Sequence, residues 1–251
     1  MTLLVAEDIC KHFGGLTALD HASLEVEEST LVGLIGPNGS GKTTMINIMA
    51  GHYKPDSGSI LFRGRDITEL KPHQVAKERL VRSFQVTRVF PKMTVMENML
   101  LAPRGQSGED LVAVFLRWPR VLEEEAELID KAIEILEFLE IDHLRDEYAS
   151  NLSGGQQKLL ELGRCLMSDP IMVLLDEPVA GVNPTLAAKI FDKILDLRNR
   201  GTTFLVIEHN MDIVMNFCEK IFVLSKGEVV ARGTPSEIQR DGKVIDAYLG
   251  G

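Results

Sequence analysis

An apolar run that leads directly into a glycine-rich loop constrains this sequence more than any other feature. Residues 31–35 read Leu-Val-Gly-Leu-Ile, which is typical of a buried strand, and residues 36–43 read Gly-Pro-Asn-Gly-Ser-Gly-Lys-Thr. This octapeptide fits the phosphate-loop pattern G-x-x-x-x-G-K-[ST], whose backbone N–H groups turn inward around a di- or triphosphate. Residues 43–50 then read as a helix whose N-terminus would face the anion. The sequence therefore predicts a phosphate-binding strand–loop–helix unit, and the alternative is a Gly-rich loop with a surface lysine.

A second apolar run ends in a pair of acidic residues. Residues 171–175 read Ile-Met-Val-Leu-Leu, and Asp176 and Glu177 follow. Such a pair would usually cap a helix or lie on the surface, but a phosphate loop in the same chain favours a catalytic interpretation. Asp176 and the Thr43 hydroxyl are suited to hold Mg²⁺, and Lys42 would reach the outer phosphates. Glu177 is then placed to orient and polarise an attacking water.

The fold class predicted from the strand and helix patterns is α/β. Short apolar strands alternate with helical stretches in the last hundred residues, which favours a mostly parallel sheet covered on both faces. The β-rich pieces around the phosphate loop suggest an antiparallel layer beside that sheet, and the middle of the chain is largely helical. We expect strands at residues 3–9, 22–26, 31–35, 57–63, 171–175, 203–207, 221–224 and 228–231. We expect helices at residues 43–50, 95–102, 121–141, 154–167 and 184–197.

The predicted domain organisation is one nucleotide-binding domain that spans residues 1–251. Its core comprises residues 1–85 and 151–251, and residues 86–150 form an inserted helical subdomain. Residues 152–156 open the helix that returns from the subdomain to the core.

Charge and hydropathy exclude several classes of protein. The net charge of −10 argues against a nucleic-acid partner that is held by broad phosphate neutralisation. No apolar stretch approaches the roughly 20 residues that a membrane-spanning helix needs, and the first eight residues lack the basic start of a signal peptide. The three cysteines form no C-x-x-C pair, so we expect reduced, buried thiols. These features predict a cytoplasmic protein whose membrane role, if any, comes through partners.

A third motif lies between the phosphate loop and the acidic pair. Residues 152–156 read Leu-Ser-Gly-Gly-Gln, and other phosphate-loop NTPases lack this sequence. With these motifs in this order, the chain resembles the ATP-binding subunits of ABC transporters from Phe13 to its last strand. The resemblance implies the ABC ATPase variant of the P-loop NTPase fold, with ATP and Mg²⁺ as cofactors. It also implies an ATPase whose hydrolysis is coupled to transmembrane transport.

The resemblance also assigns residues to the site. It implies that the Phe13 ring stacks on adenine, a contact that contributes about 1–3 kcal/mol per base. It implies that Gln85 senses Mg²⁺ and the nucleophilic water, that His209 is the switch histidine beside the catalytic Glu177, and that the metal is held by Thr43, Gln85 and Asp176. The implied ATP-binding residues are Phe13, Gly36, Pro37, Asn38, Gly39, Ser40, Gly41, Lys42, Thr43 and Thr44. The implied signature residues are Ser153, Gly154, Gly155 and Gln156.

The signature residues explain why the family forms dimers. Ser153 stands at the head of a predicted helix, where its hydroxyl and the backbone N–H groups form a second anion-binding end. In the family this end binds the γ-phosphate held by a second ATP-binding subunit in a head-to-tail dimer, and two ATP molecules are buried at the interface.

Several segments are similar to importers of branched-chain amino acids. They are residues 84–90, 93–98, 180–184 and 247–250. Asn183 stands where most ABC ATPases have aspartate, which argues against the related lipopolysaccharide-export ATPase. The similarity implies amino-acid uptake, integral membrane permease subunits and, indirectly, a periplasmic or extracellular solute-binding protein. The chain would then be peripheral on the inner face of the membrane, with Phe90, Pro91 and Met93 as a docking face for a permease helix.

Three other interpretations remain. The chain could be the ATPase of a different ABC system, such as lipopolysaccharide export. It could be a non-transport ABC switch on nucleic acid, although it has no coiled coil, second cassette or basic extension. The third interpretation is a phosphate-loop kinase, which would leave the motif at residues 152–156 unexplained.

Two interpretations also apply to residues 111–116. They could dock a permease or pack inside the helical subdomain.

Overall fold

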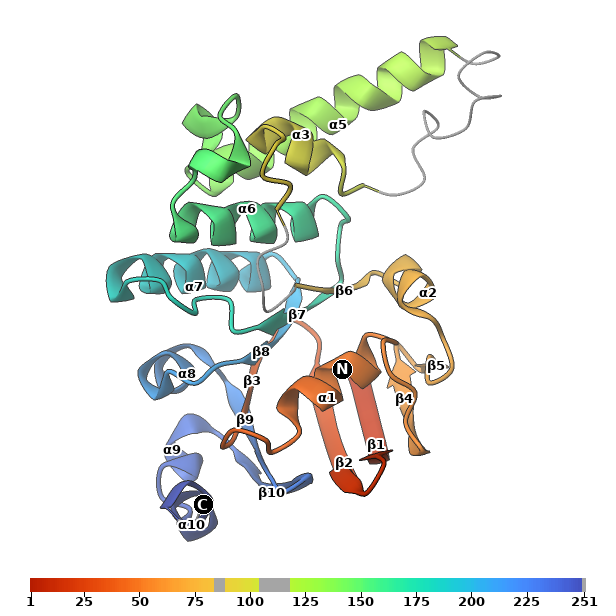
Figure 1. The fold of residues 1–251 in the computed structure, drawn as a ribbon, viewed down its shortest axis with the longest axis vertical. Helices are drawn as coiled ribbons and strands as arrows, with labels where there is room; N and C mark the ends of the chain where they lie inside the picture. Colours follow the sequence, from red (N-terminus) through yellow and green to blue (C-terminus); the bar gives the residue numbers. More distant parts are fainter. Residues whose placement is uncertain (84–88, 104–117, 250–251) are drawn as a thin grey trace. The chain divides into compact units, whose positions relative to one another are not determined.

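The computed structural model describes residues 1–83, 89–103 and 118–249 (Figure 1). By internal contacts the chain forms two compact units. The first comprises residues 1–85, 171–180 and 188–251, and the second comprises residues 86–170 and 181–187. The division of the domain at residue 150 stays a prediction. Residues 151–170 belong to the second unit, where helix α6 (Gly154–Leu166) packs against α3 (Val95–Leu100) and α5 (Trp118–Phe138).

A six-stranded sheet forms the centre of the first unit. Its strand order is β10-β9-β3-β8-β7-β6, and every neighbouring pair is parallel except β10 with β9. Every residue of β3, β7 and β8 is buried, as expected for parallel strands covered on both faces. The mostly parallel sheet predicted from the sequence is therefore confirmed. The bounds are β3 (Leu31–Ile35), β6 (Leu80–Arg82), β7 (Met172–Asp176), β8 (Thr203–Ile207), β9 (Lys220–Ser225) and β10 (Glu228–Gly233).

A four-stranded antiparallel sheet accompanies it, with the order β2-β1-β4-β5. The strands are β1 (Thr2–Phe13), β2 (Leu16–Glu27), β4 (Ser57–Phe62) and β5 (Arg65–Asp66). The β1–β2 hairpin is longer than the sequence predicts, since both strands continue to a turn at Gly14 and Gly15. The pairing of β1 with β2 has several register shifts, and the polar residues Glu7 and Asp8 lie at the shift between Ala6 and Ile9.

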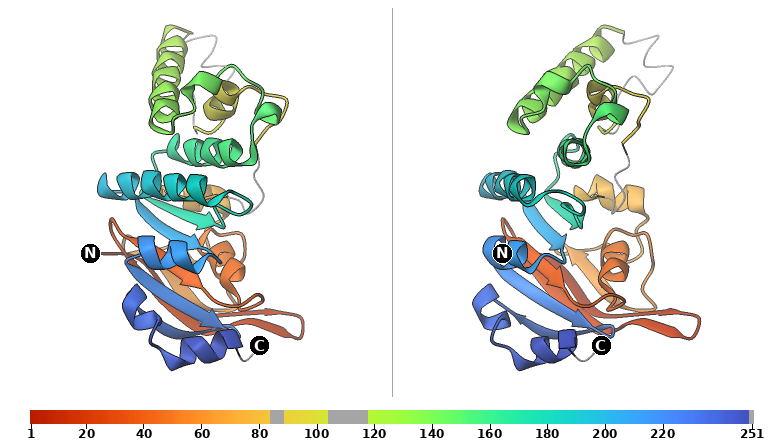
Figure 2. Two further views of the ribbon diagram at one scale, coloured as in Figure 1. Left: turned by 90° about the vertical axis from the view of Figure 1, so that its left-hand side faces the viewer. Right: turned by 60° about the vertical axis from the view of Figure 1, so that its left-hand side comes forward.

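The core of the first unit joins the two sheets around helix α1 (Lys42–Met49). Its fully buried members include Leu4 of β1, Phe62 of β4, Met45 of α1 and Phe222 of β9. Figure 2 shows α1 beside strands of both sheets. The helix that carries the end of the phosphate loop is therefore anchored by the apolar cluster that joins both sheets.

Four further helices of the first unit are too short for apolar periodicity to reveal. They are α2 (Pro72–Lys77), α8 (Met211–Phe217), α9 (Pro235–Ile238) and α10 (Gly242–Leu249). Helix α7 (Pro184–Asn199) belongs partly to each unit.

Helices build the second unit. They are α3 (Val95–Leu100), α5 (Trp118–Phe138) and α6, with the 3-10 turns η2 (Asp142–Leu144) and η3 (Ala149–Asn151). Leu139 and Met99 pack against Gly163 so closely that a Cβ on this glycine would lie 3.0 Å from each. The buried Asn98 side chain accepts from the Phe90 amide at 2.8 Å and donates to the Thr94 carbonyl at 2.8 Å, which fixes the turn before α3. Within the described ranges, we find no helix that is both long and apolar enough to cross a membrane.

Candidate functional site

The loop between β3 and α1 adopts a conformation that depends on its glycines. Gly36, Gly39 and Gly41 have φ values of 148°, 78° and 107°. A Cβ on Gly36 would lie 2.0 Å from the Leu224 carbonyl oxygen, and one on Gly41 would lie 2.4 Å from the Ala18 carbonyl oxygen. Any side chain at these two positions would therefore displace neighbouring backbone as well as strain its own.

The Lys42 side chain turns back into the loop that precedes it. Its Nζ donates to the carbonyl oxygens of Gly36 and Pro37 at 2.8 and 2.9 Å, and the residue is only 5% exposed. Burial lowers the pKa of Lys42, and the nearby Glu177 and Asp176 carboxylates oppose that shift. The buried Ser40 hydroxyl lies in the same loop and has no hydrogen-bond partner among the described residues. The loop thus gathers a buried cation and a buried hydroxyl that a phosphate group could satisfy.

Asp176 lies beside this loop because three parallel strands end together. Leu34 of β3 pairs with Ile207 of β8, and Ile207 pairs with Asp176 of β7. The carboxyl ends of neighbouring parallel strands meet at one edge of a sheet, which is the usual place for a site in an open α/β fold.

The Asp176 side chain is fully buried, and one of its two carboxylate oxygens has no hydrogen-bond partner among the described residues. Its Oδ2 accepts from Arg82 Nη2 at 3.0 Å, whereas its Oδ1 has no partner among the described residues. Burial raises the pKa of Asp176, and Arg82 opposes that effect. Arg82 also donates to Asn47 Oδ1 of α1 at 2.5 Å, so one guanidinium connects the acidic strand end to the phosphate-loop helix.

Glu177 and His209 form a pair at the same edge. His209 Nε2 lies 3.0 Å from Glu177 Oε1, and the Glu177 amide donates to the Ile207 carbonyl at 3.0 Å. Glu177 has a φ of 51°, which is uncommon outside glycine, and it directly follows the last residue of β7.

Glu208 supports the backbone on either side of that pair. It is 4% exposed, and its carboxylate accepts from the amides of Val179 and His209 at 3.2 Å each. Burial raises the pKa of Glu208, and these backbone donors oppose the rise. The loops after β7 and β8 are therefore connected through one buried carboxylate.

Other nucleotide-site residues predicted from the sequence lie at the phosphate loop, at the start of α1 and at the end of β1. Thr43 and Thr44 open α1, with Thr43 exposed, and Asn38 is exposed in the loop. Phe13 ends β1 and is 43% exposed. Gln85 lies outside the described residues, so its predicted role stays a prediction.

The signature residues begin helix α6 in the second unit. The Ser153 hydroxyl accepts from the Gln156 amide at 3.3 Å, and Gln156 Oε1 accepts from the Ser153 amide at 2.8 Å. This is a capping box, which is sufficient by itself to explain both side chains. Gly154 is exposed, whereas a Cβ on Gly155 would lie 2.0 Å from Leu186 Cδ2. The helix N-terminus predicted from the sequence is confirmed, and its role toward a second subunit stays a prediction.

The docking residues named from the sequence lie only partly in the described chain. Phe90 is 46% exposed, and the Arg164 guanidinium carbon lies 5.1 Å from its ring centroid. Residues 84–88 and 111–116 fall outside the described ranges.

Sequence reasoning missed Arg82, Asn47 and Glu208. Arg82 ends a strand of three residues that no apolar pattern marks. Asn47 lies inside a helix, and an asparagine at such a position gives no sequence signal that it belongs to a site. The position of Glu208 could have indicated a role in the site, since it lies between a fully buried strand and the predicted site residue His209.

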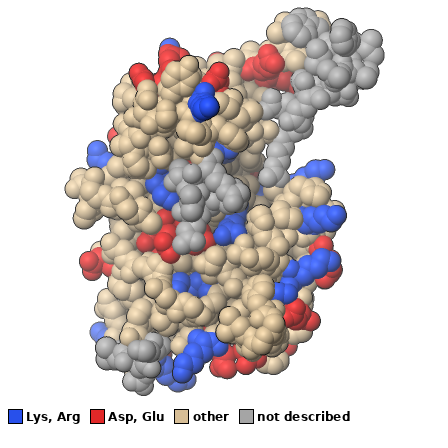
Figure 3. All heavy atoms as spheres, in the orientation of Figure 1, with Lys and Arg blue, Asp and Glu red and all other residues tan. Residues whose placement is uncertain are grey.

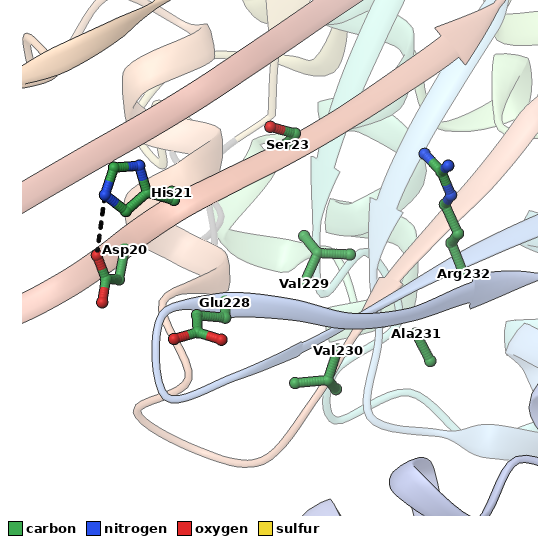
Figure 4. A pocket seen from close by; sticks show the side chains of 8 residues that line it. All are labelled: Asp20, His21, Ser23, Glu228, Val229, Val230, Ala231 and Arg232. Carbon is green, nitrogen blue, oxygen red and sulfur yellow. Dashed lines mark ion pairs between the residues drawn. The ribbon is translucent and has the colours of Figure 1, made fainter.

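A hollow of about 420 Å³ lies elsewhere on the first unit, between β2 and β10 (Figure 4). His21 lies at its rim, with Nδ1 2.6 Å from Asp8 Oδ1 and Nε2 3.8 Å from Asp20 Oδ1. The Asp8 carboxylate beside it raises the pKa of His21. These groups pair with one another, and no phosphate-loop residue lines the hollow, so we do not assign the nucleotide to it.

Positive and negative side chains are mixed on one face of the molecule. On the face drawn in Figure 3, the Lys and Arg side chains of the described residues are interspersed with Asp and Glu. The described residues of this face therefore form no continuous basic patch, and the absence of a nucleic-acid partner stays a prediction.

Comparisons with known proteins agree with these motifs. The family model for ABC transporters matches residues 19–180, and a model for branched-chain amino acid ATP-binding cassette transporters matches residues 228–251. A probable branched-chain amino acid transport ATP-binding protein of Archaeoglobus fulgidus is 44% identical over 250 residues, which are 100% of this chain and 96% of that protein.

Solved structures are similar over the same length. An ATP-binding cassette of an ABC transporter in its ADP conformation has a TM-score of 0.86 and 41% identity, with all of both chains covered. A dimeric bacterial ABC transporter cassette has a TM-score of 0.77 and 27% identity, covering 93% of this chain and 99% of that one. The predicted fold class is therefore confirmed.

Proposed function

This chain belongs to the ATP-binding proteins of ABC transporters, and on that premise we propose that its hydrolysis of ATP powers the uptake of branched-chain or related amino acids. The ATPase activity follows from the family. The solute is supported by the Archaeoglobus fulgidus relative and by the family match at residues 228–251.

Nucleotide phosphates are bound by the loop of residues 36–43 and the start of α1. Lys42 exchanges its bonds to loop carbonyls for the outer phosphates, and the orphaned Ser40 hydroxyl gains an acceptor. Anion binding is favoured further by the N-terminus of α1.

Mg²⁺ fits the residues at the strand edge. The buried Asp176 Oδ1 lacks a partner among the described residues, and the exposed Thr43 hydroxyl is available at the start of α1. These two residues, with Gln85, would hold the ion, which when bound neutralises charge on the β- and γ-phosphate oxygens.

Glu177 and His209 carry the hydrolytic step in this proposal. The observation that supports it is their 3.0 Å contact at the strand edge that also holds Asp176, because His209 then restrains a carboxylate that could accept a proton from water. His209 orients that carboxylate and offers a donor to the terminal phosphate.

A second cassette completes the site. We place Ser153, Gly154, Gly155 and Gln156 against the γ-phosphate held by a partner subunit, since Ser153 and Gly154 are exposed at the start of α6. A dimeric cassette among the similar structures supports this assembly. Integral membrane permeases bind the dimer to the inner face of the membrane and receive solute from an external binding protein.

Reconstitution tests the proposal. The chain, its permeases and the binding protein are placed in liposomes, and ATP-dependent accumulation of labelled leucine is measured with the Glu177→Gln variant as the matched control. We expect inward accumulation with the wild-type chain only. Outward movement of lipid would contradict this function and support a lipopolysaccharide-export ATPase. Phosphorylation of a small molecule without transport would support a phosphate-loop kinase.

A further inference from the structure

Phe13 stands at a strand end that leaves its ring largely exposed. It is the last residue of β1 and pairs with Leu16 across the Gly14-Gly15 turn. A Cβ on either glycine would meet no atom within 4 Å, so the turn projects into open space. A side chain on such a tip has rotamer freedom that it must lose when a base stacks on it.

Tyr53 restricts that freedom. The ring centroids of Phe13 and Tyr53 are 5.3 Å apart with an interplanar angle of 71°, which is the edge-to-face arrangement that aromatic pairs prefer. Lys11 Nζ lies 5.6 Å from the Phe13 ring centroid, within the range of a cation–π contact. Both neighbours leave Phe13 43% exposed, so part of the ring stays open to a ligand.

The segment of residues 52–56, here called the strut, ties Tyr53 to the phosphate-loop helix. The amides of His52 and Tyr53 donate to the Asn47 carbonyl in the last turns of α1, at 2.8 and 3.2 Å. Asn47 Nδ2 donates in turn to the Thr43 carbonyl at 2.7 Å, one helical turn earlier. The position of Tyr53 is therefore set by the helix that begins with Lys42.

The other end of the strut holds the strand that carries Phe13. The Asp56 amide donates to the Cys10 carbonyl at 2.8 Å, and its carboxylate accepts from Lys11 Nζ at 2.8 Å and from the His12 amide at 2.6 Å. The bonds from Lys11 and His12 lower the pKa of Asp56 to about 2, so the carboxylate stays ionised at neutral pH. The strut thus connects α1 to the last residues of β1.

We propose that Tyr53 is a positioning residue for the nucleotide base, holding the Phe13 ring at a fixed place relative to the phosphate loop. The inference rests on the proposed role of Phe13 in stacking on adenine. Tyr53 acts on the base indirectly, by restraining the Phe13 ring. The strut holds both rings at a fixed distance from Lys42, because it is bonded to α1 at one end and to β1 at the other.

If Tyr53 positions Phe13 in this way, removal of the Tyr53 ring should lower the affinity only for ligands that carry a base. Aromatic pairs contribute about 0.5–1.5 kcal/mol beyond their buried area, which corresponds to about 2- to 10-fold in a dissociation constant. A ligand without a base does not use Phe13, so its affinity should be independent of Tyr53. A general disturbance of the fold would weaken both ligands.

Isothermal titration calorimetry of the full chain with ADP and with pyrophosphate, each with Mg²⁺, separates these cases. We expect Tyr53→Ala to weaken ADP binding about 2- to 10-fold and to leave pyrophosphate binding unchanged. Tyr53→Phe keeps the ring and should bind ADP as the wild type does. Tyr148→Ala, which removes a tyrosine that is 54% exposed in the second unit, should change neither affinity.

Two further variants make the outcomes distinguishable. Phe13→Ala should weaken ADP binding selectively, and Phe13→Ala with Tyr53→Ala should be no weaker than Phe13→Ala alone, because both act through one ring. If Phe13→Ala weakens ADP binding but Tyr53→Ala does not, or if the two losses add, the positioning inference is wrong and the stacking role stands. If Phe13→Ala leaves ADP binding unchanged, the stacking role is wrong and the inference falls with it.

Discussion

Replacing Arg82 by Met should destabilise the first unit in a way that depends on pH. Arg82 is the partner of Asp176 Oδ2 at 3.0 Å, and the side chains are 10% and 0% exposed. Met retains much of the apolar stem of Arg82 but leaves a buried carboxylate without its cation. Breaking one side of a buried ion pair costs about 3–5 kcal/mol, so we expect a loss of that size at pH 8.

The sign of the pH dependence follows from the direction of the pKa shift. Burial raises the pKa of Asp176 above its usual range, and loss of Arg82 removes the main opposing effect. A carboxyl whose pKa is raised in the folded state is destabilising when ionised, and the cost disappears as pH falls below that raised pKa toward the unfolded value of about 3.9. The stability deficit of Arg82→Met should therefore shrink as the pH falls from 8 to 4, near the unfolded pKa.

Urea denaturation followed by circular dichroism at both pH values measures this deficit relative to wild type. The matched control is Arg82→Met with Asp176→Asn, which leaves no charge to bury and should show a smaller deficit with little pH dependence. A deficit below about 1 kcal/mol, or one equal at pH 8 and pH 4, would refute the view that Arg82 compensates a buried Asp176 carboxylate.

Three further predictions test the phosphate loop and the shared site. Lys42→Ala should abolish measurable ATP hydrolysis and weaken ATP binding in calorimetry, and a wild-type rate would show that the loop has been misinterpreted. Gly41→Ala should lower the urea midpoint more than Gly39→Ala, since both have positive φ but only the former places a Cβ 2.4 Å from backbone; equal losses would contradict the steric argument. Glu177→Gln should reduce hydrolysis by about 10²–10⁴ and accumulate as a nucleotide-bound dimer in analytical ultracentrifugation with ATP. Adding Ser153→Arg should dissolve that dimer, and a double variant that still dimerises would rule out a signature acting from the opposite chain.

Local patterns predicted much of this molecule. The phosphate loop, the apolar strands and the helix start at Ser153 are encoded in short segments, because backbone conformation and burial there follow from residues a few positions apart. Thr203–Ile207 is a strand in the structure with the bounds that the sequence predicts. Short elements such as α2 and β6 were missed because one or two turns, or three residues, carry too little periodicity.

Contacts between distant segments could not be predicted in this way. Arg82 is 94 residues from Asp176 and 35 from Asn47, and nothing in the intervening chain indicates that one guanidinium would reach both. The same holds for Tyr53 and Phe13, which belong to a loop and to a strand end.

The sequence by itself determined that the chain has a phosphate loop, an acidic strand end and a helix beginning at the signature motif. Only the tertiary structure decided which side chains complete the site, because strand order sets the neighbours. The order β3-β8-β7 aligns Leu34, Ile207 and Asp176 in adjacent strands, and that alignment brings Glu177, His209 and Arg82 to one edge of the sheet. Strand order is selected by burial over the whole first unit, a property that no single segment carries.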